Sequence, residues 1–231
     1  VAQLVLLDSD FAALPSVVGE GRRVINNIER SATLFLVKNI FSFIVSLVLL
    51  FAAMPYPLVP AQISLLSGLL IGVPSFLLTF EPSYGRVRGS FMRSVLLNAL
   101  PGGLVNVVNL LAVMWIGSGM GLPMEQISTV CTLLAGTAGF MVLLFLCWPL
   151  SRWRFAIVAA MGVGFIGACV LLGPLFGLSP LSGRAWTLLG VFAAATPALM
   201  CLFVFLVSRV KQRLRRSQRA KHAAGLSATL S

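Results

Sequence analysis

The strongest constraint on this chain is a set of apolar segments, each long enough to cross a lipid bilayer as a helix. About 20 helical residues are needed to cross a hydrocarbon core of roughly 30 Å. Such segments lie at residues 32–53, 60–80, 94–116, 127–150, 155–177 and 185–207. Hydrophobic residues make up 58% of the chain and charged residues only 10%, which excludes an ordinary soluble domain. The sequence therefore predicts an all-α membrane protein with six transmembrane helices.

The basic residues fall unevenly on the two sides of the predicted bundle. If the N-terminus is cytosolic, every Lys and Arg except Arg184 lies on the cytosolic side or, for Lys38, near it. The positive-inside rule favours this orientation, with both termini cytosolic. Because topology accounts for the net charge of +11, we expect no nucleic-acid partner. Residues 209–231 are predicted to form a basic cytosolic tail that attracts anionic lipids, by about 1 kcal/mol per basic residue.

The first apolar segment continues a polar helix without a strong helix breaker. The stretch "GEGRRVINNIERSATLFLVKNIFSF" passes directly from charged to apolar residues. Before it, the sequence predicts a short strand, an acidic turn at residues 8–10 and a helix start near residues 12–15. A helix of roughly 37 residues would be about 55 Å long. We therefore expect residues 1–30 to include a cytosolic stalk, followed by a membrane domain at residues 31–208.

Polar residues in the first two spans are candidates for function, because such residues are costly in lipid. Lys38 is the single charge embedded in a predicted span. It lies about six residues, or about 9 Å, inside the boundary of the first span, so its ammonium group could reach the headgroups by snorkelling. Snorkelling and a functional role both remain open. Asn39 and Ser42 share one helix face. Residues 64–79 carry a stripe of Ser, Gly and Thr, for which close packing and ion handling are equally good explanations.

Two proline-containing segments are expected to disturb their helices. The sequence Gly72-Val73-Pro74 in the second span is expected to unwind it and free carbonyl groups for an ion. The sequence "PGG" at residues 101–103 is expected to kink or loosen the third span. The third span also contains Asn98, Asn106 and Asn109, which we expect to form hydrogen bonds between helices.

Two stretches resemble one family of membrane proteins. The sequence "VLLDSDFAALPSVVGEGRRVINNIERSATLFLVKNIFS" resembles the junction between the phosphorylation domain and the fifth transmembrane helix of P-type ATPases. The sequence "PAQISLLSGLLIGVPSFLLTFEPS" resembles their sixth helix. The stretches "LFLVKN" and "GVPSFLL" are most similar to bacterial, calcium-pump-related pumps of the CtpE type. The resemblance covers residues 5–82 well, and later spans match in number and topology. It implies the fifth to tenth helices of a longer protein.

The resemblance also implies roles for individual residues. Asn39 stands at an ion-site asparagine, Ser42 where calcium pumps have a glutamate, and Ser67 in place of another asparagine. Lys38 falls where gastric proton pumps carry a lysine. The implied ion pathway is Lys38, Asn39, Ser42, Ser67, Gly72 and Pro74, with Asn39, Ser42 and Ser67 as metal ligands, and the implied coupling stalk contains Arg22, Asn26 and Asn27. The carboxylate ligands that the family carries in these two helices are missing.

The implied activity is that of an ATP-driven pump for a cation, with Ca²⁺ favoured, in a bacterial plasma membrane. ATP and Mg²⁺ would bind to N-terminal pump domains that precede Val1, so no catalytic residue is expected in this chain. Two alternatives remain open. One is a freestanding six-span permease or channel, and the other is a membrane anchor that transports nothing.

Overall fold

The computed structural model describes residues 14–81 and 90–229, with side chains as far as Gln212. Within these ranges six helices are long and apolar enough to cross a membrane, and no strand is present. This confirms the predicted all-α, six-span fold. The predicted strand and acidic turn before residue 14 lie outside the described residues, as does most of the basic loop that follows Glu81.

The helices follow one another with short connections. The first crossing is α1 (Leu14–Phe51), and the second consists of α2 (Pro60–Ser67), the π-helix η2 (Gly68–Gly72) and α3 (Val73–Thr79). The remaining crossings are α4 (Phe91–Gly119), α5 (Met124–Leu146), α6 (Arg152–Leu171) and α7 (Gly183–Thr229), with a short 3₁₀ helix, η3 (Pro174–Phe176), between α6 and α7. α5 and α6 end at Leu146 and Leu171, before the predicted boundaries at residues 150 and 177. After α5, Pro149 disfavours helix at the preceding residue.

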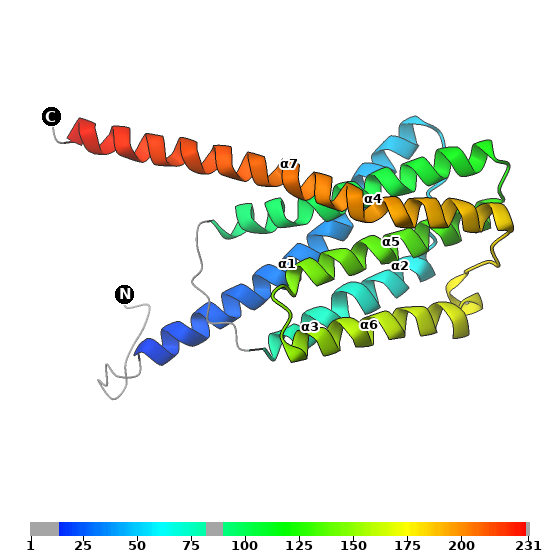
Figure 1. The fold of residues 1–231 in the computed structure, drawn as a ribbon, viewed down its shortest axis with the longest axis horizontal. Coiled ribbons are helices and arrows are strands. Elements are labelled where there is room, and N and C mark those ends of the chain that lie inside the picture. Colours follow the sequence, from blue (N-terminus) through cyan, green and yellow to red (C-terminus); the bar gives the residue numbers. More distant parts are fainter. Residues whose placement is uncertain (1–13, 82–89, 230–231) are drawn as a thin grey trace.

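Two helices project from the bundle at the same end. Figure 1 shows the beginning of α1 and the end of α7 extending beyond the other helices. α1 is one continuous helix of 38 residues and α7 one of 47. The prediction that the first span extends as a helical stalk is therefore confirmed.

α4 lies at the centre of the bundle and packs against α1, α5 and α7. In the most apolar 18-residue stretch of α4, 61% of the residues are buried, compared with 11% in the corresponding stretch of α7. A Cβ atom at Gly103 would lie 2.7 Å from Cγ2 of Ile40, and one at Gly102 would collide with Val142 and press on Val37. The helix is continuous through Pro101. The two glycines allow α1 and α5 to approach α4 closely. The kink or loosening expected at residues 101–103 stays a prediction.

The second crossing does not unwind at Gly72-Val73-Pro74, contrary to expectation. Its backbone widens into η2, where the N–H of Val73 donates to the carbonyl of Gly68, five residues earlier. Pro74 has no N–H group, and a π-turn accommodates this loss while the helix continues into α3. The crossing thus contains one wide turn instead of an unwound segment.

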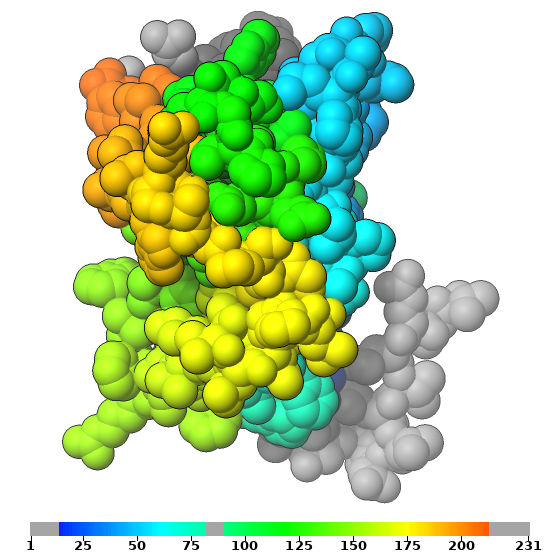
Figure 2. Space-filling view, turned by 90° about the vertical axis from the view of Figure 1, so that its right-hand side faces the viewer, coloured from blue at the N-terminus to red at the C-terminus, as the bar shows by residue number. Residues whose placement is uncertain are grey.

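A neutral hydrogen-bond network fastens the end of the bundle opposite the stalk. Gln62 is fully buried, and its Nε2 donates to the carbonyl of Gly177 at 3.1 Å. Its Oε1 accepts from the hydroxyl of Ser128 at 2.8 Å and from the N–H of Val59 at 3.2 Å. Gly177 has φ 66°, a conformation that favours glycine. Figure 2 looks onto this end, where the loop between α6 and α7, drawn in yellow, lies against neighbouring helices.

The close approach of α1 and α4 leads to a first prediction. We expect Gly103→Val to lower the free energy of unfolding by about 1–3 kcal/mol, because the new side chain collides with Ile40. The control is Gly119→Val at the end of the same helix, where a Cβ atom would meet nothing within 4 Å. Thermal unfolding in detergent, followed by tryptophan fluorescence, measures both. Equal melting temperatures for the two variants would contradict the packing role.

Candidate functional site

A small cavity lies inside the bundle between α1, the second crossing, α4 and α5. Its volume is about 40 Å³, enough for a water-sized ligand. The polar residues in its lining are Lys38, Ser67 and Asn106, and the rest of the lining is apolar. Two predicted residues from separate helices, Lys38 and Ser67, are therefore brought together at one cavity.

Asn106 is the member of this cavity that sequence analysis did not assign to the ion pathway. Its side chain is 1% exposed, and its Nδ2 donates to the carbonyl of Gly102 in the same helix at 3.0 Å. Its Oδ1 is buried and has no hydrogen-bond partner among the described residues. An acceptor left in this state costs about 1–3 kcal/mol. Asn106 is thus a lining residue of the cavity whose buried oxygen has no hydrogen-bond donor among the described residues.

The expectation of hydrogen bonds between helices is wrong for Asn106 and confirmed for the other two asparagines. Asn109 donates to Thr196 Oγ1 of α7 at 2.9 Å. Asn98 accepts from Lys211 Nζ, also of α7, at 2.8 Å. The two bonded asparagines fasten α4 to α7. The Oδ1 atoms of Asn106 and Asn109 are both buried without a partner among the described residues, and of these two asparagines Asn106 lines the cavity.

The remaining predicted residues of the ion pathway lie outside this cavity. Asn39 is exposed on α1, and Ser42 is half-buried. The hydroxyl of Tyr56 donates to Ser42 Oγ at 3.3 Å. Burial raises the pKa of Tyr56 above its ordinary value, so its hydroxyl stays protonated and able to donate. Gly72 and Pro74 belong to the wide turn of the second crossing and its continuation.

The described residues do not form a complete site for a divalent cation. The lining offers two side-chain oxygens, from Ser67 and Asn106, and also contains Lys38, a cation. Calcium takes six to eight oxygen ligands. No group of three or more His, Cys, Asp or Glu residues that could hold a metal occurs in the part of the chain that the structure describes. A bound calcium ion would need further ligands.

A charged cluster lies at the end of the bundle that carries the stalk. Glu81 follows α3, and its Oε2 accepts from Arg30 Nη1 of α1 at 3.2 Å. Arg154 Nε of α6 contacts both carboxylate oxygens at 2.8 and 2.9 Å, and the hydroxyl of Ser151 lies 3.4 Å from Oε1. The three charged side chains are only 12–18% exposed. The Glu81 cluster, formed by Arg30, Glu81, Ser151 and Arg154, therefore connects three crossings.

Two stalk residues contact the end of the second crossing directly. Asn27 is buried, and its Nδ2 donates to the carbonyl of Thr79 at 3.1 Å. Arg23 Nη2 reaches the same carbonyl at 3.5 Å. These donors satisfy a carbonyl group at a helix end, where no partner within the helix remains. Of the other predicted stalk residues, Asn26 lines a larger cavity and Arg22 is exposed.

Known proteins similar to this chain are named as cation-transporting ATPases, although no family model matches it. The chain is 35% identical over 178 residues to the probable cation-transporting ATPase exp7 of Streptococcus pneumoniae, covering 74% of the chain and 23% of the relative. It is 32% identical over 232 residues to the calcium-transporting ATPase CtpE of Mycolicibacterium smegmatis, covering 94% of the chain and 29% of the relative. A P-type sodium-transporting ATPase4 of Toxoplasma gondii is 34% identical over 82 residues, covering 36% of the chain and 6% of the relative.

The chain belongs to the P-type cation-transporting ATPases. It spans about a quarter of the length of the relatives exp7 and CtpE. We call the small cavity lined by Lys38, Ser67 and Asn106 the Lys38 cavity. In this P-type ATPase chain, α1 forms the stalk and contributes Arg30 to the Glu81 cluster and Lys38 to the Lys38 cavity. Figure 1 shows α1 running through the bundle.

The Glu81 cluster leads to a second prediction for the P-type ATPase chain. Glu81→Gln should lower the free energy of unfolding by about 3 kcal/mol, because it leaves Arg30 and Arg154 without their carboxylate in a mostly buried place. The matched control is Glu20→Gln, whose ion pair with Arg23 is exposed and should contribute less than about 1 kcal/mol. Urea unfolding in detergent gives both values. A Glu81 variant as stable as the Glu20 variant would rule out the structural role of the cluster.

Proposed function

We propose that the chain is the membrane part of an ATP-driven cation pump and that the whole protein couples aspartyl phosphorylation to ion translocation. The printed names of the relatives, which describe cation and calcium transport, support this proposal. Calcium is the favoured cation, because the relative that matches over 94% of the chain is named as a calcium-transporting ATPase. ATP and Mg²⁺ would bind to domains outside this chain.

The observation that carries the proposal is the continuity of α1 from the stalk to the cavity. One helix of 38 residues contains Asn27 and Arg30 at the projecting end and Lys38 at the cavity. Hydrogen bonds along the whole helix make it stiff, and no break separates the stalk from Lys38. A displacement of the stalk would therefore also displace Lys38. In the proposed pump, α1 transmits movement of the cytosolic domains to the ion pathway.

The ion pathway of the proposed pump includes Lys38, Ser67 and Asn106, together with Asn39 and Ser42 on α1. Asn39 is exposed and is therefore accessible to residues outside this chain. Since the described oxygens are too few for calcium, further ligands would come from other membrane helices of the whole protein. With the projecting ends of α1 and α7 on the cytosolic side, the protein would lie in a bacterial plasma membrane with both ends in the cytosol.

The proposal predicts a selective effect of Asn106→Leu in the full-length protein. The replacement removes the unpartnered oxygen but keeps the volume, so stability should stay the same or rise. If Asn106 contacts the ion, the cation concentration for half-maximal ATPase activity should rise by about tenfold, as expected for a loss of about 1.4 kcal/mol. Lys38→Ala should also alter this cation dependence.

Arg184→Ala is the control, because Arg184 is the second residue of α7, which begins at the opposite end of the bundle from the stalk. ATP hydrolysis is measured with Ca²⁺, Mn²⁺ and Na⁺ as the varied cations, at constant Mg²⁺. If no cation stimulates the unmodified protein, the pump proposal fails and a membrane anchor is favoured. If cations stimulate it but both pathway variants behave like Arg184→Ala, the pump remains and the assigned pathway is wrong.

A further inference from the structure

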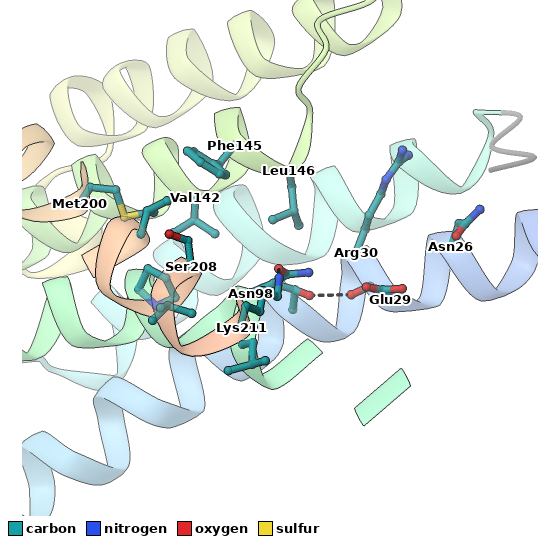
Figure 3. A pocket seen from close by; sticks show the side chains of 15 residues that line it. Asn26, Glu29, Arg30, Asn98, Val142, Phe145, Leu146, Met200, Ser208 and Lys211 are labelled. Carbon is teal, nitrogen blue, oxygen red and sulfur yellow. Dashed lines mark hydrogen bonds between the residues drawn. The ribbon is translucent and has the colours of Figure 1, made fainter. Parts of the chain in front are cut away.

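A second, larger cavity lies between α1, α4, α5 and α7. Its volume is about 530 Å³, within the range of ligand-binding pockets in proteins. It shares only Val142 with the lining of the Lys38 cavity. Figure 3 shows side chains from the stalk helix and from α7 around it. The cavity is therefore a separate feature that the proposed ion pathway does not use.

The lining of this cavity changes from apolar to polar along its length. The apolar part consists of Leu97, Pro101, Val142, Phe145, Leu146, Met200, Val204 and Val207. The polar part consists of Asn26, Glu29, Arg30, Thr33, Asn98, Ser208 and Lys211. In Figure 3, Val142 and Met200 lie together, whereas Arg30 and Asn26 lie apart from them along α1. A matching ligand would have an apolar part and a polar head.

The change from apolar to polar coincides with the ends of the membrane-spanning stretches. On α7, Val204 lies within the apolar stretch, and Lys211 follows where basic residues begin. On α1, Asn26 and Arg30 precede the apolar stretch that starts near residue 32. The polar part is thus at the level of lipid headgroups, and the apolar part is at the level of the acyl chains.

Hydrogen bonds hold the charged groups at the polar end in place. Lys211 Nζ donates to Asn98 Oδ1 at 2.8 Å, and Arg30 is paired with Glu81. Glu29 accepts a hydrogen bond from the hydroxyl of Ser94. Together with the adjoining Glu81 cluster, the polar end contains three cations, Lys211, Arg30 and Arg154, and two carboxylates, Glu29 and Glu81. The net charge of +1 favours an anionic head. The carboxylate of Glu29 suits a head that also carries hydroxyl groups.

We propose that this cavity binds an anionic phospholipid, with its phosphate next to Lys211 and Asn98 and an acyl chain along Val142, Met200 and Val204. The combination of charge, depth and apolar lining supports a lipid over a soluble phosphate compound, which would leave the apolar part unfilled. This proposal does not rest on the proposed pump function. Lipid binding is measured without transport, so either proposal can fail while the other stands.

Native mass spectrometry of the full-length protein tests the proposal directly. The detergent-solubilised protein is incubated with equal amounts of phosphatidylglycerol and phosphatidylcholine, and the retained lipid is counted per protein. We expect phosphatidylglycerol to be retained preferentially. Lys211→Ala should weaken its retention by about fivefold, the effect of one basic residue near an anionic head. Lys211→Arg should restore most of it, because the positive charge is kept.

Two further variants separate this cavity from general charge attraction. Arg184→Ala removes one positive charge at the other end of the bundle and should leave lipid retention unchanged. Val204→Trp fills the apolar part while Lys211 remains, and it should reduce retention of phosphatidylglycerol. Equal retention of both lipids, or equal losses in the Lys211→Ala and Arg184→Ala variants, would overturn the proposal. Displacement by glycerophosphoglycerol, the soluble head alone, would also overturn it and identify a phosphate site.

Discussion

The fold depends on the close approach of α4 to its neighbours at Gly102 and Gly103. Ile40 of α1 occupies the space that a side chain at Gly103 would need, and Val142 of α5 occupies the space at Gly102, where Val37 of α1 is also in contact. Lys38 lies between Val37 and Ile40 in sequence, and Asn106 lies one turn beyond Gly102, to whose carbonyl it is bonded. The same contact that packs α1 against α4 therefore places Lys38 and Asn106 at one cavity. A larger residue at either glycine would alter both the packing and the cavity.

Different polar groups fasten the two ends of the bundle. At one end Gln62, which is neutral and fully buried, connects α2 with α5 and with the loop after η3. At the other end the side chain of Glu81 is 12% exposed and pairs with arginines of α1 and α6. Removing one partner of a mostly buried ion pair leaves a charge unpaired, whereas the network at Gln62 carries no charge. Charged groups thus hold the end of the bundle that carries the stalk, and neutral hydrogen bonds hold the opposite end.

The sequence was sufficient to predict the six spans and the continuous first helix, because both follow from residue composition along short stretches. It was not sufficient for contacts between distant residues. Glu81 bonds to arginines 51 and 73 residues away, and the unpartnered oxygen of Asn106 depends on which helices surround it. The proline in Gly72-Val73-Pro74 indicated a disturbed helix, but an unwound segment and a π-turn have the same local sequence pattern. The predicted ion ligands Asn39 and Ser42 remain a prediction.

The wide turn η2 changes how residues of the second crossing can be compared. A helix advances by about 100° per residue, so the one extra residue in a π-turn shifts the faces on its two sides by about that angle. The Ser and Gly stripe of residues 64–79 therefore does not run straight: Ser64 is exposed before the turn and Gly68 at its first residue, whereas Ser75 is buried after it. A helical wheel drawn through the whole crossing therefore misplaces the residues on one side of the turn by about 100°. Alignments with relatives that lack the turn would need a one-residue gap here.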